Sequence, residues 1–94
     1  MKSIMQTEKG VCFISGKRGY TEEHHIFYGG GRRKLSEKYG LKVYLSPEYH
    51  RTGPEAVHNC QETRRRLEAA GQREFERRGR SRQEFMNIFG RNYL

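Results

Sequence analysis

The order of apolar and polar positions predicts short strands in the first half of the chain. Residues 11–15 and 20–27 have extended patterns, and the glycine-containing turn at 16–19 between them predicts an N-terminal hairpin. A single helical turn is expected at 36–40, because a glycine ends that polar run. Residues 41–45 alternate between apolar and polar side chains, which is the period of a half-buried strand.

Helix signals occupy the second half of the chain. Ser46-Pro47 supplies an N-cap and a first-turn proline, so His50 is expected in the first turn of a helix. The start signal is repeated at 52–55, which predicts a kink or a restart before a helix that continues to about residue 78. A capping box at 81–84 then opens a short C-terminal helix.

The length of the chain predicts one domain with a thin core. A sequence of 94 residues is too short to divide, so we expect a single domain over 1–94, with a core unit at about 11–78 and a helix at about 81–90. Only 33% of the residues are apolar and Trp is absent, so a bound metal would add useful stability. The expected core residues are Phe13, Ile14, Phe27, Val43, Leu45, Leu67, Phe75, Phe85, Ile88 and Phe89.

The charge of the chain points to a polyanionic partner. There are 19 Lys and Arg against 11 Asp and Glu, a formal net charge of +8, for which nucleic acid is the default partner. A membrane partner is not expected, because no long apolar run or signal segment is present and the Arg-rich helix lacks a broad apolar face. Cys12 and Cys60 form no disulfide framework, so we expect reduced thiols and a cytoplasmic protein.

Four histidines supply the candidate chemistry. His24 and His25 end the first extended run, and His50 and His58 follow the second. Neighbouring strand residues point to opposite faces, so one of the pair can bind a metal while the other faces a substrate. Three neutral imidazoles suit Zn, Ni or Co and tolerate Mg or Mn, and the remaining ring can take a proton near neutral pH. This set predicts metal-dependent phosphodiester hydrolysis, although an adjacent His pair alone is also compatible with a surface accident.

A basic cluster follows a run of three glycines. Arg32, Arg33 and Lys34 come directly after 29–31, where glycines let the backbone approach a ligand, and we expect the cations to bind DNA phosphates. The alternative is a solvated turn. For the three arginines at 64–66, an exposed helix face is nearly as good an interpretation as phosphate binding.

From about residue 12 to residue 59 the chain resembles the HNH or His-Me finger nucleases, whose ββα-metal motif has these parts in this order. The His24-His25 pair is similar to the family's first signature, which implies that His24 is a metal ligand and His25 the general base. The segment Leu45-Ser-Pro-Glu-Tyr-His50 resembles the family's Leu-Cys-x-x-Cys-His, whose final His binds metal. His58 is similar to a later helix His that completes the ligand set in some members.

More narrowly, the chain resembles small phage-encoded recombination-enhancement nucleases. The similarity lies in the block from His24 through Arg33–Lys42 and in the tail Phe89–Leu94. It implies a phage protein that acts in the bacterial cytoplasm, cleaves DNA in recombination with one divalent metal ion, and has a recombinase filament as a partner. Sequence specificity is expected to be low, because no base-recognition helix is evident.

Two positions depart from the family pattern. Many relatives carry a zinc knuckle of two cysteine pairs, and the corresponding places here are Cys12, Ser15, Ser46 and Tyr49. One thiolate cannot hold a structural zinc, so none is expected. The signature's central Asn is also absent, and we consider Asn59 as a substitute that orients the substrate.

The sequence therefore predicts an α+β fold with a ββα-metal core, an N-terminal hairpin and a C-terminal helical extension. The expected function is a divalent-metal-dependent DNA endonuclease. One alternative is a non-catalytic nucleic-acid-binding protein that kept the HNH fold. Another is a zinc-stabilised phage interaction module.

Overall fold

A two-stranded antiparallel sheet forms the centre of the fold. The computed structural model describes residues 1–94 and pairs β1, Glu22–His25, with β2, Lys42–Leu45. The register places His25 opposite Lys42 and Glu22 opposite Leu45. The strand predicted at 41–45 is confirmed as β2, and Leu41, Val43 and Leu45 are each 0% exposed, but the polar Lys42 between them is also buried, at 6%.

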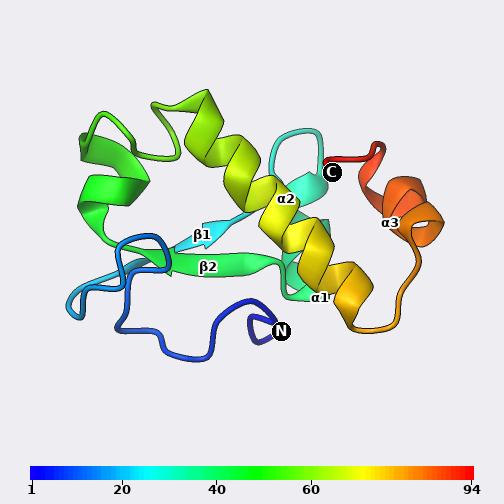
Figure 1. Ribbon diagram of the computed structural model, residues 1–94, viewed down its shortest axis with the longest axis horizontal. Helices are drawn as coiled ribbons and strands as arrows, with labels where there is room; N and C mark the ends of the chain where they lie inside the picture. Colours follow the sequence, from blue (N-terminus) through cyan, green and yellow to red (C-terminus); the bar gives the residue numbers. More distant parts are fainter.

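Four helical segments surround the sheet and give a small α+β fold. Helix α1, Arg32–Tyr39, connects the two strands, and a π-helical turn, Glu48–Thr52, follows β2. Helix α2, Gln61–Arg77, is the longest element, and α3, Arg82–Phe89, follows it. Figure 1 shows α2 running diagonally past the two strands, with α3 at one end of the molecule and the C-terminal tail running back from it toward the middle.

The core is one cluster of eleven buried apolar residues. Its members are Cys12, Ile26, Phe27, Leu41, Val43, Leu45, Val57, Leu67, Phe75, Phe85 and Phe89. Phe85 and Phe89 of α3 stack with ring centroids 4.7 Å apart, and both contact Phe27 after β1. The C-terminal helix is therefore part of the core, as its apolar spacing predicted. Ile14 was wrongly assigned to the core, because it is 36% exposed.

A glycine brings α2 close to the sheet. A Cβ atom on Gly71 would lie 3.4 Å from Ile26 Cγ2 and 3.6 Å from Phe27 Cε2. A Cβ atom would thus be in van der Waals contact with these buried side chains, which follow β1 directly, and a side chain longer than alanine would have little room. Gly71 thus helps to fix α2 against the segment that carries the histidine pair.

The predicted N-terminal hairpin is reduced to a single bridge between Val11 and Arg18. The strand expected at 11–15 is wrong, because Cys12 O accepts a hydrogen bond from Gly16 N at 2.8 Å and closes a turn. One extended contact to the sheet remains, where Phe13 N donates to Tyr44 O at 2.8 Å. The strand expected at 20–27 is shortened to β1.

Two helix boundaries also differ from the sequence prediction. The turn expected at 36–40 is the end of the longer helix α1, so the basic cluster lies in the first helical turn. The helix expected from 55 begins only at Gln61, because residues 53–60 form a tight connection in which Ala56 O accepts from both Asn59 N and Cys60 N. No helix in the chain is long and apolar enough to cross a membrane.

Candidate metal centre and its cleft

Strand β1 delivers its two histidines to different clusters, as the alternation of strand side chains requires. His24 meets His50 and His58, while His25 meets Glu23 and Glu37. Both rings are buried, with His24 3% and His25 7% exposed. Both also line one cleft of about 300 Å³, together with Glu23, Tyr28, Arg33, His50, Arg51 and His58.

The first cluster contains three imidazoles. One ring nitrogen from each of His24, His50 and His58 lies within 4.8 Å of the others. The Nε2 atoms of His50 and His58 are 3.1 Å apart. Two nitrogens bound at ~2.1 Å to one tetrahedral ion would be ~3.4 Å apart, so the pair needs little adjustment to share a metal.

The segment after β2 brings His50 and His58 together. His50 N donates to Ser46 O at 2.8 Å, which places His50 in the first turn, as predicted. The chain then folds back, because Gly53 adopts an extended conformation and Val57 N donates to Tyr49 O at 2.8 Å. The predicted kink at 52–55 is thus the feature that allows residues eight positions apart to approach one another.

A hydrogen bond with Glu22 orients the imidazole of His50. Its Nδ1 atom lies 2.7 Å from Glu22 Oε1, and the hydrogen bond from His50, with the nearby charge of Arg51, lowers the pKa of Glu22. The ionised carboxylate can only accept a hydrogen bond, so Nδ1 carries a proton and, in the neutral ring, Nε2 carries the lone pair. A carboxylate behind a metal-binding histidine fixes its tautomer in this way.

His24 has an open coordination position. Its Nε2 atom is the only fully buried side-chain nitrogen or oxygen in the chain without a hydrogen-bond partner. Burial, together with the nearby His50 and His58, lowers the pKa of His24 to about 3, so the ring is neutral near pH 7. A buried unsatisfied nitrogen is costly, and a metal ion would satisfy it. Three imidazoles, of which His50 is oriented by Glu22, are a suitable donor set for Zn, Ni or Co.

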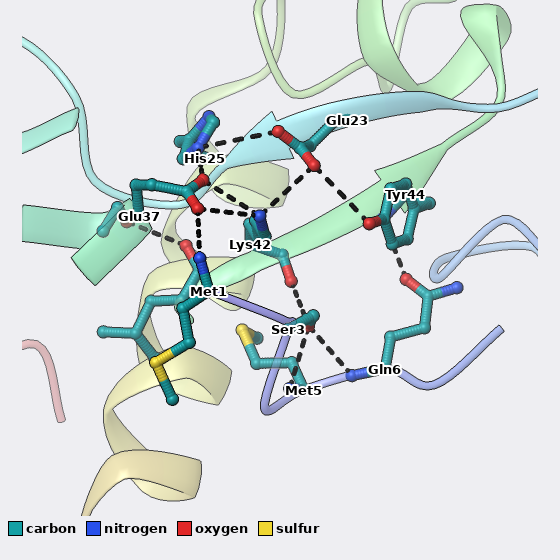
Figure 2. A network of polar contacts seen from close by, with 11 residues as sticks. Met1, Ser3, Met5, Gln6, Glu23, His25, Glu37, Lys42 and Tyr44 are labelled. Atoms are coloured by element: carbon teal, nitrogen blue, oxygen red, sulfur yellow. Dashed lines mark hydrogen bonds and ion pairs between the residues drawn. The ribbon is translucent and has the colours of Figure 1, made fainter. Parts of the chain in front are cut away.

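The second cluster is ionic, as Figure 2 shows. His25 Nε2 lies 2.8 Å from Glu37 Oε1 and 3.7 Å from Glu23 Oε1. Lys42 Nζ is 2.9 Å from Glu37 Oε1, and the N-terminal amine of Met1 is 2.6 Å from Glu37 Oε2. Sequence reasoning missed Glu37, because it lies on a helix that was expected to be a single turn.

The three members of the predicted DNA-binding cluster lie in different surroundings. Arg33 is exposed and lines the histidine cleft. Arg32 donates to Tyr93 Oη at 2.9 Å and to Gly29 O, so its guanidinium ties the helix start to the C-terminal tail. Lys34 is exposed and does not line the cleft. The sequence did not single out Arg51, which lines the cleft from the π-helical turn.

An aromatic side chain and another arginine border the three imidazoles. The Tyr28 ring centroid lies 5.7 Å from those of His24 and His58. The Arg64 guanidinium stacks on Tyr28 at 4.6 Å from the ring centroid. Desolvation, with the charges of His50, Arg51 and Arg64, lowers the pKa of His58, although much of that residue is exposed. Desolvation, with these neighbouring charges, therefore favours the neutral forms of His24 and His58.

Asn59 is engaged with the backbone. Its Nδ2 atom donates to Arg51 O and to Gly53 O, at 2.6 and 3.2 Å, and it thereby holds the connection between His50 and His58. Asn59 does not line the cleft. These contacts stabilise the connection that carries His50 and His58. The role of Asn59 toward a substrate stays a prediction.

Comparisons with protein-family models, with curated proteins and with solved structures found no match to this chain. The resemblance to HNH nucleases therefore rests on the sequence motifs alone.

Proposed function

We propose that the chain is a divalent-metal-dependent DNA endonuclease with a ββα-metal core. The observation that carries this proposal is the single cleft that contains three converging imidazoles and a fourth, separately held histidine. His24, His50 and His58 would hold one ion. That ion, when bound, would supply charge stabilisation for a scissile phosphate and its leaving oxygen.

His25 is the residue we assign as general base. Its Nε2 atom is occupied by Glu37, whereas its Nδ1 atom makes no hydrogen bond and is not sealed from solvent. A proton from water can therefore be accepted at Nδ1. General-base assistance of this kind contributes roughly 10²–10⁴-fold to a rate.

The charge around the cleft supports a phosphodiester as the substrate. Arg33 of α1 and Arg51 of the π-helical turn both line the cleft, so two elements contribute positive charge to it. Helix α1 also begins with three cations and has no side-chain cap. Positive side chains at the positive end of a helix dipole are unfavourable, and an anion bound at this helix start would compensate them. These contacts would position a phosphate backbone without distinguishing bases.

The positions that the resemblance aligns with a zinc knuckle also support the proposal. Ser46 Oγ donates to Cys12 Sγ at 3.6 Å, and Tyr49 N donates to Ser46 O at 3.1 Å. Burial raises the pKa of Cys12, but hydrogen bonds from Ser15 and Ser46 outweigh it and bring the value to about 7. Hydrogen bonds thus join the positions where relatives place metal ligands.

A plasmid-nicking assay tests the proposal. The purified protein is expected to relax supercoiled DNA with at least one of Mg, Mn, Co, Ni or Zn, and EDTA is expected to abolish the reaction. Single-stranded and recombinase-coated DNA should be included, because the resemblance implies a role in recombination. Absence of cleavage under all these conditions, with DNA binding retained, would contradict the enzyme and favour the non-catalytic binding protein.

A further inference from the structure

The second cluster has the donors of a metal site but already contains a cation. Donor atoms of Glu23, His25 and Glu37 lie within 4.8 Å of one another. Lys42 Nζ lies 2.9 and 3.1 Å from the two oxygens of Glu37 and 3.4 Å from Glu23. The hydrogen bond to Glu37 and the charge of Glu23 outweigh burial and raise the pKa of Lys42. The ammonium of Lys42 and the amine of Met1 together compensate the charges of these two carboxylates and occupy oxygens that a metal ion would need.

The charges around Glu37 determine where the proton of His25 lies. Hydrogen bonds from the amine of Met1, from His25 and from Lys42 hold the pKa of Glu37 well below its usual range. An ionised carboxylate only accepts hydrogen bonds, so His25 Nε2 must be the donor in the 2.8 Å contact. In the neutral ring the lone pair then lies on Nδ1, the nitrogen without a hydrogen bond.

The fold holds Glu37 rigidly in this position. The adjacent Ser36 is 0% exposed, and its hydroxyl donates to Leu41 O at 2.8 Å and accepts from Phe27 N at 3.0 Å. Gly40 ends α1 in a left-handed conformation, and a Cβ atom there would lie 2.5 Å from Lys2 O. The last turn of α1 is thus joined both to the segment after β1 and to the start of β2. A side chain that positions another group needs such fixed support to keep its geometry.

We propose that Glu37 is a positioning residue that holds His25 with its proton on Nε2 and its lone pair on Nδ1. The contribution of this contact to catalysis rests on the nuclease function proposed above, whereas the tautomer itself does not. Glu37 touches no substrate in this assignment. It acts only through the imidazole of His25.

Nitrogen-15 NMR of the imidazole rings tests the proposal without any substrate. In the wild type, with the ring neutral, His25 should be in the Nε2–H form. Glu37→Gln should give a mixture of the two neutral tautomers, because an amide can accept from Nε2 or donate to it. The matched control is Glu23→Gln, which removes a charge from the same cluster at a carboxylate 3.7 Å from the ring, and it should leave the tautomer unchanged.

Three results would overturn the proposal. They are an Nδ1–H form in the wild type, an unchanged tautomer in Glu37→Gln, and equal changes in Glu37→Gln and Glu23→Gln. The wild-type spectrum keeps the test decisive even if Glu37→Gln does not fold.

Steady-state cleavage then measures the consequence for catalysis. Glu37→Gln should lower kcat roughly 10- to 100-fold, which is less than the full rate contribution of a general base. KM should change by less than about twofold. A change in KM alone would contradict a positioning role. Absence of cleavage by the wild type would instead overturn the nuclease proposal, while the NMR result still decides the tautomer.

Discussion

Two clusters that begin at adjacent residues of β1 differ in charge. The cluster of His24 combines three imidazoles, and its only carboxylate, Glu22, stands behind His50. The cluster of His25 combines two carboxylates with the ammonium of Lys42. One group offers imidazole nitrogen atoms, one of which is buried and unsatisfied, whereas the other is a set of carboxylates compensated by Lys42 and the amine of Met1.

The difference shows how a short strand places two adjacent side chains in different chemical environments. Side chains that alternate across β1 enter environments that differ in charge and in hydrogen bonding. In the proposed function, a metal ion would bind at the site with free lone pairs, and a carboxylate would orient a proton acceptor at the other. We therefore expect substitutions in the two clusters to have separable effects on metal binding and on cleavage.

The largest expected effect comes from substituting the two adjacent histidines. His25→Ala should retain the metal and the DNA affinity but lower the cleavage rate by roughly 10²–10⁴-fold, because only the general base is lost. His24→Ala should lose metal and activity together. Metal content and single-turnover cleavage measured on both variants check this. If His25→Ala keeps its activity while His24→Ala keeps its metal and loses activity, the ligand and the base are reversed.

A smaller effect is expected from the carboxylate behind His50. Glu22→Gln should weaken metal binding roughly 10- to 100-fold, because the tautomer of His50 is no longer fixed. Isothermal titration with Zn or Co measures the affinity. Glu23→Gln changes the adjacent carboxylate, which contacts His25 and Lys42 instead, and should leave the affinity unchanged. Equal losses in both variants would show that overall charge, rather than this hydrogen bond, controls the ion.

The smallest effect concerns the basic cluster at the start of α1. Arg33→Gln should weaken DNA binding similarly for different sequences and reduce the slope of log affinity against log salt by about 0.9 per lost phosphate contact. Arg32→Gln is the matched control, because its guanidinium is bonded to Tyr93 and should change the slope less. Fluorescence anisotropy at several salt concentrations gives both slopes. A larger change of slope in Arg32→Gln than in Arg33→Gln would place the phosphate contacts away from the cleft.

Sequence patterns predicted the parts of this structure that depend on local signals. The alternation at 41–45, the start signal before His50 and the apolar spacing of α3 each correspond to an observed element. The turn at 12–16 was mistaken for a strand, because its apolar residues favour an extended form while the hydrogen bond from Gly16 to Cys12 closes a turn.

The approach of the three imidazoles was predicted, but their supporting residues were not. Glu22 and Glu37 reach His50 and His25 across sequence separations of 28 and 12 residues. Such contacts depend on strand register and on the angle of α1, which no local pattern specifies. Asn59 was considered as a residue that orients the substrate. In the structure its side chain instead donates to two backbone carbonyls, which come close to it only when the connection is folded.

Metal stoichiometry combined with X-ray absorption spectroscopy tests the central claim most directly. The wild-type protein, loaded with Zn or Co and dialysed, should contain one ion per chain, with imidazole nitrogens from His24, His50 and His58 as its protein ligands. His50→Ala should lose that ion. A second ion per chain, sulfur or carboxylate ligation, or unchanged metal content in His50→Ala would contradict the assignment of the two clusters.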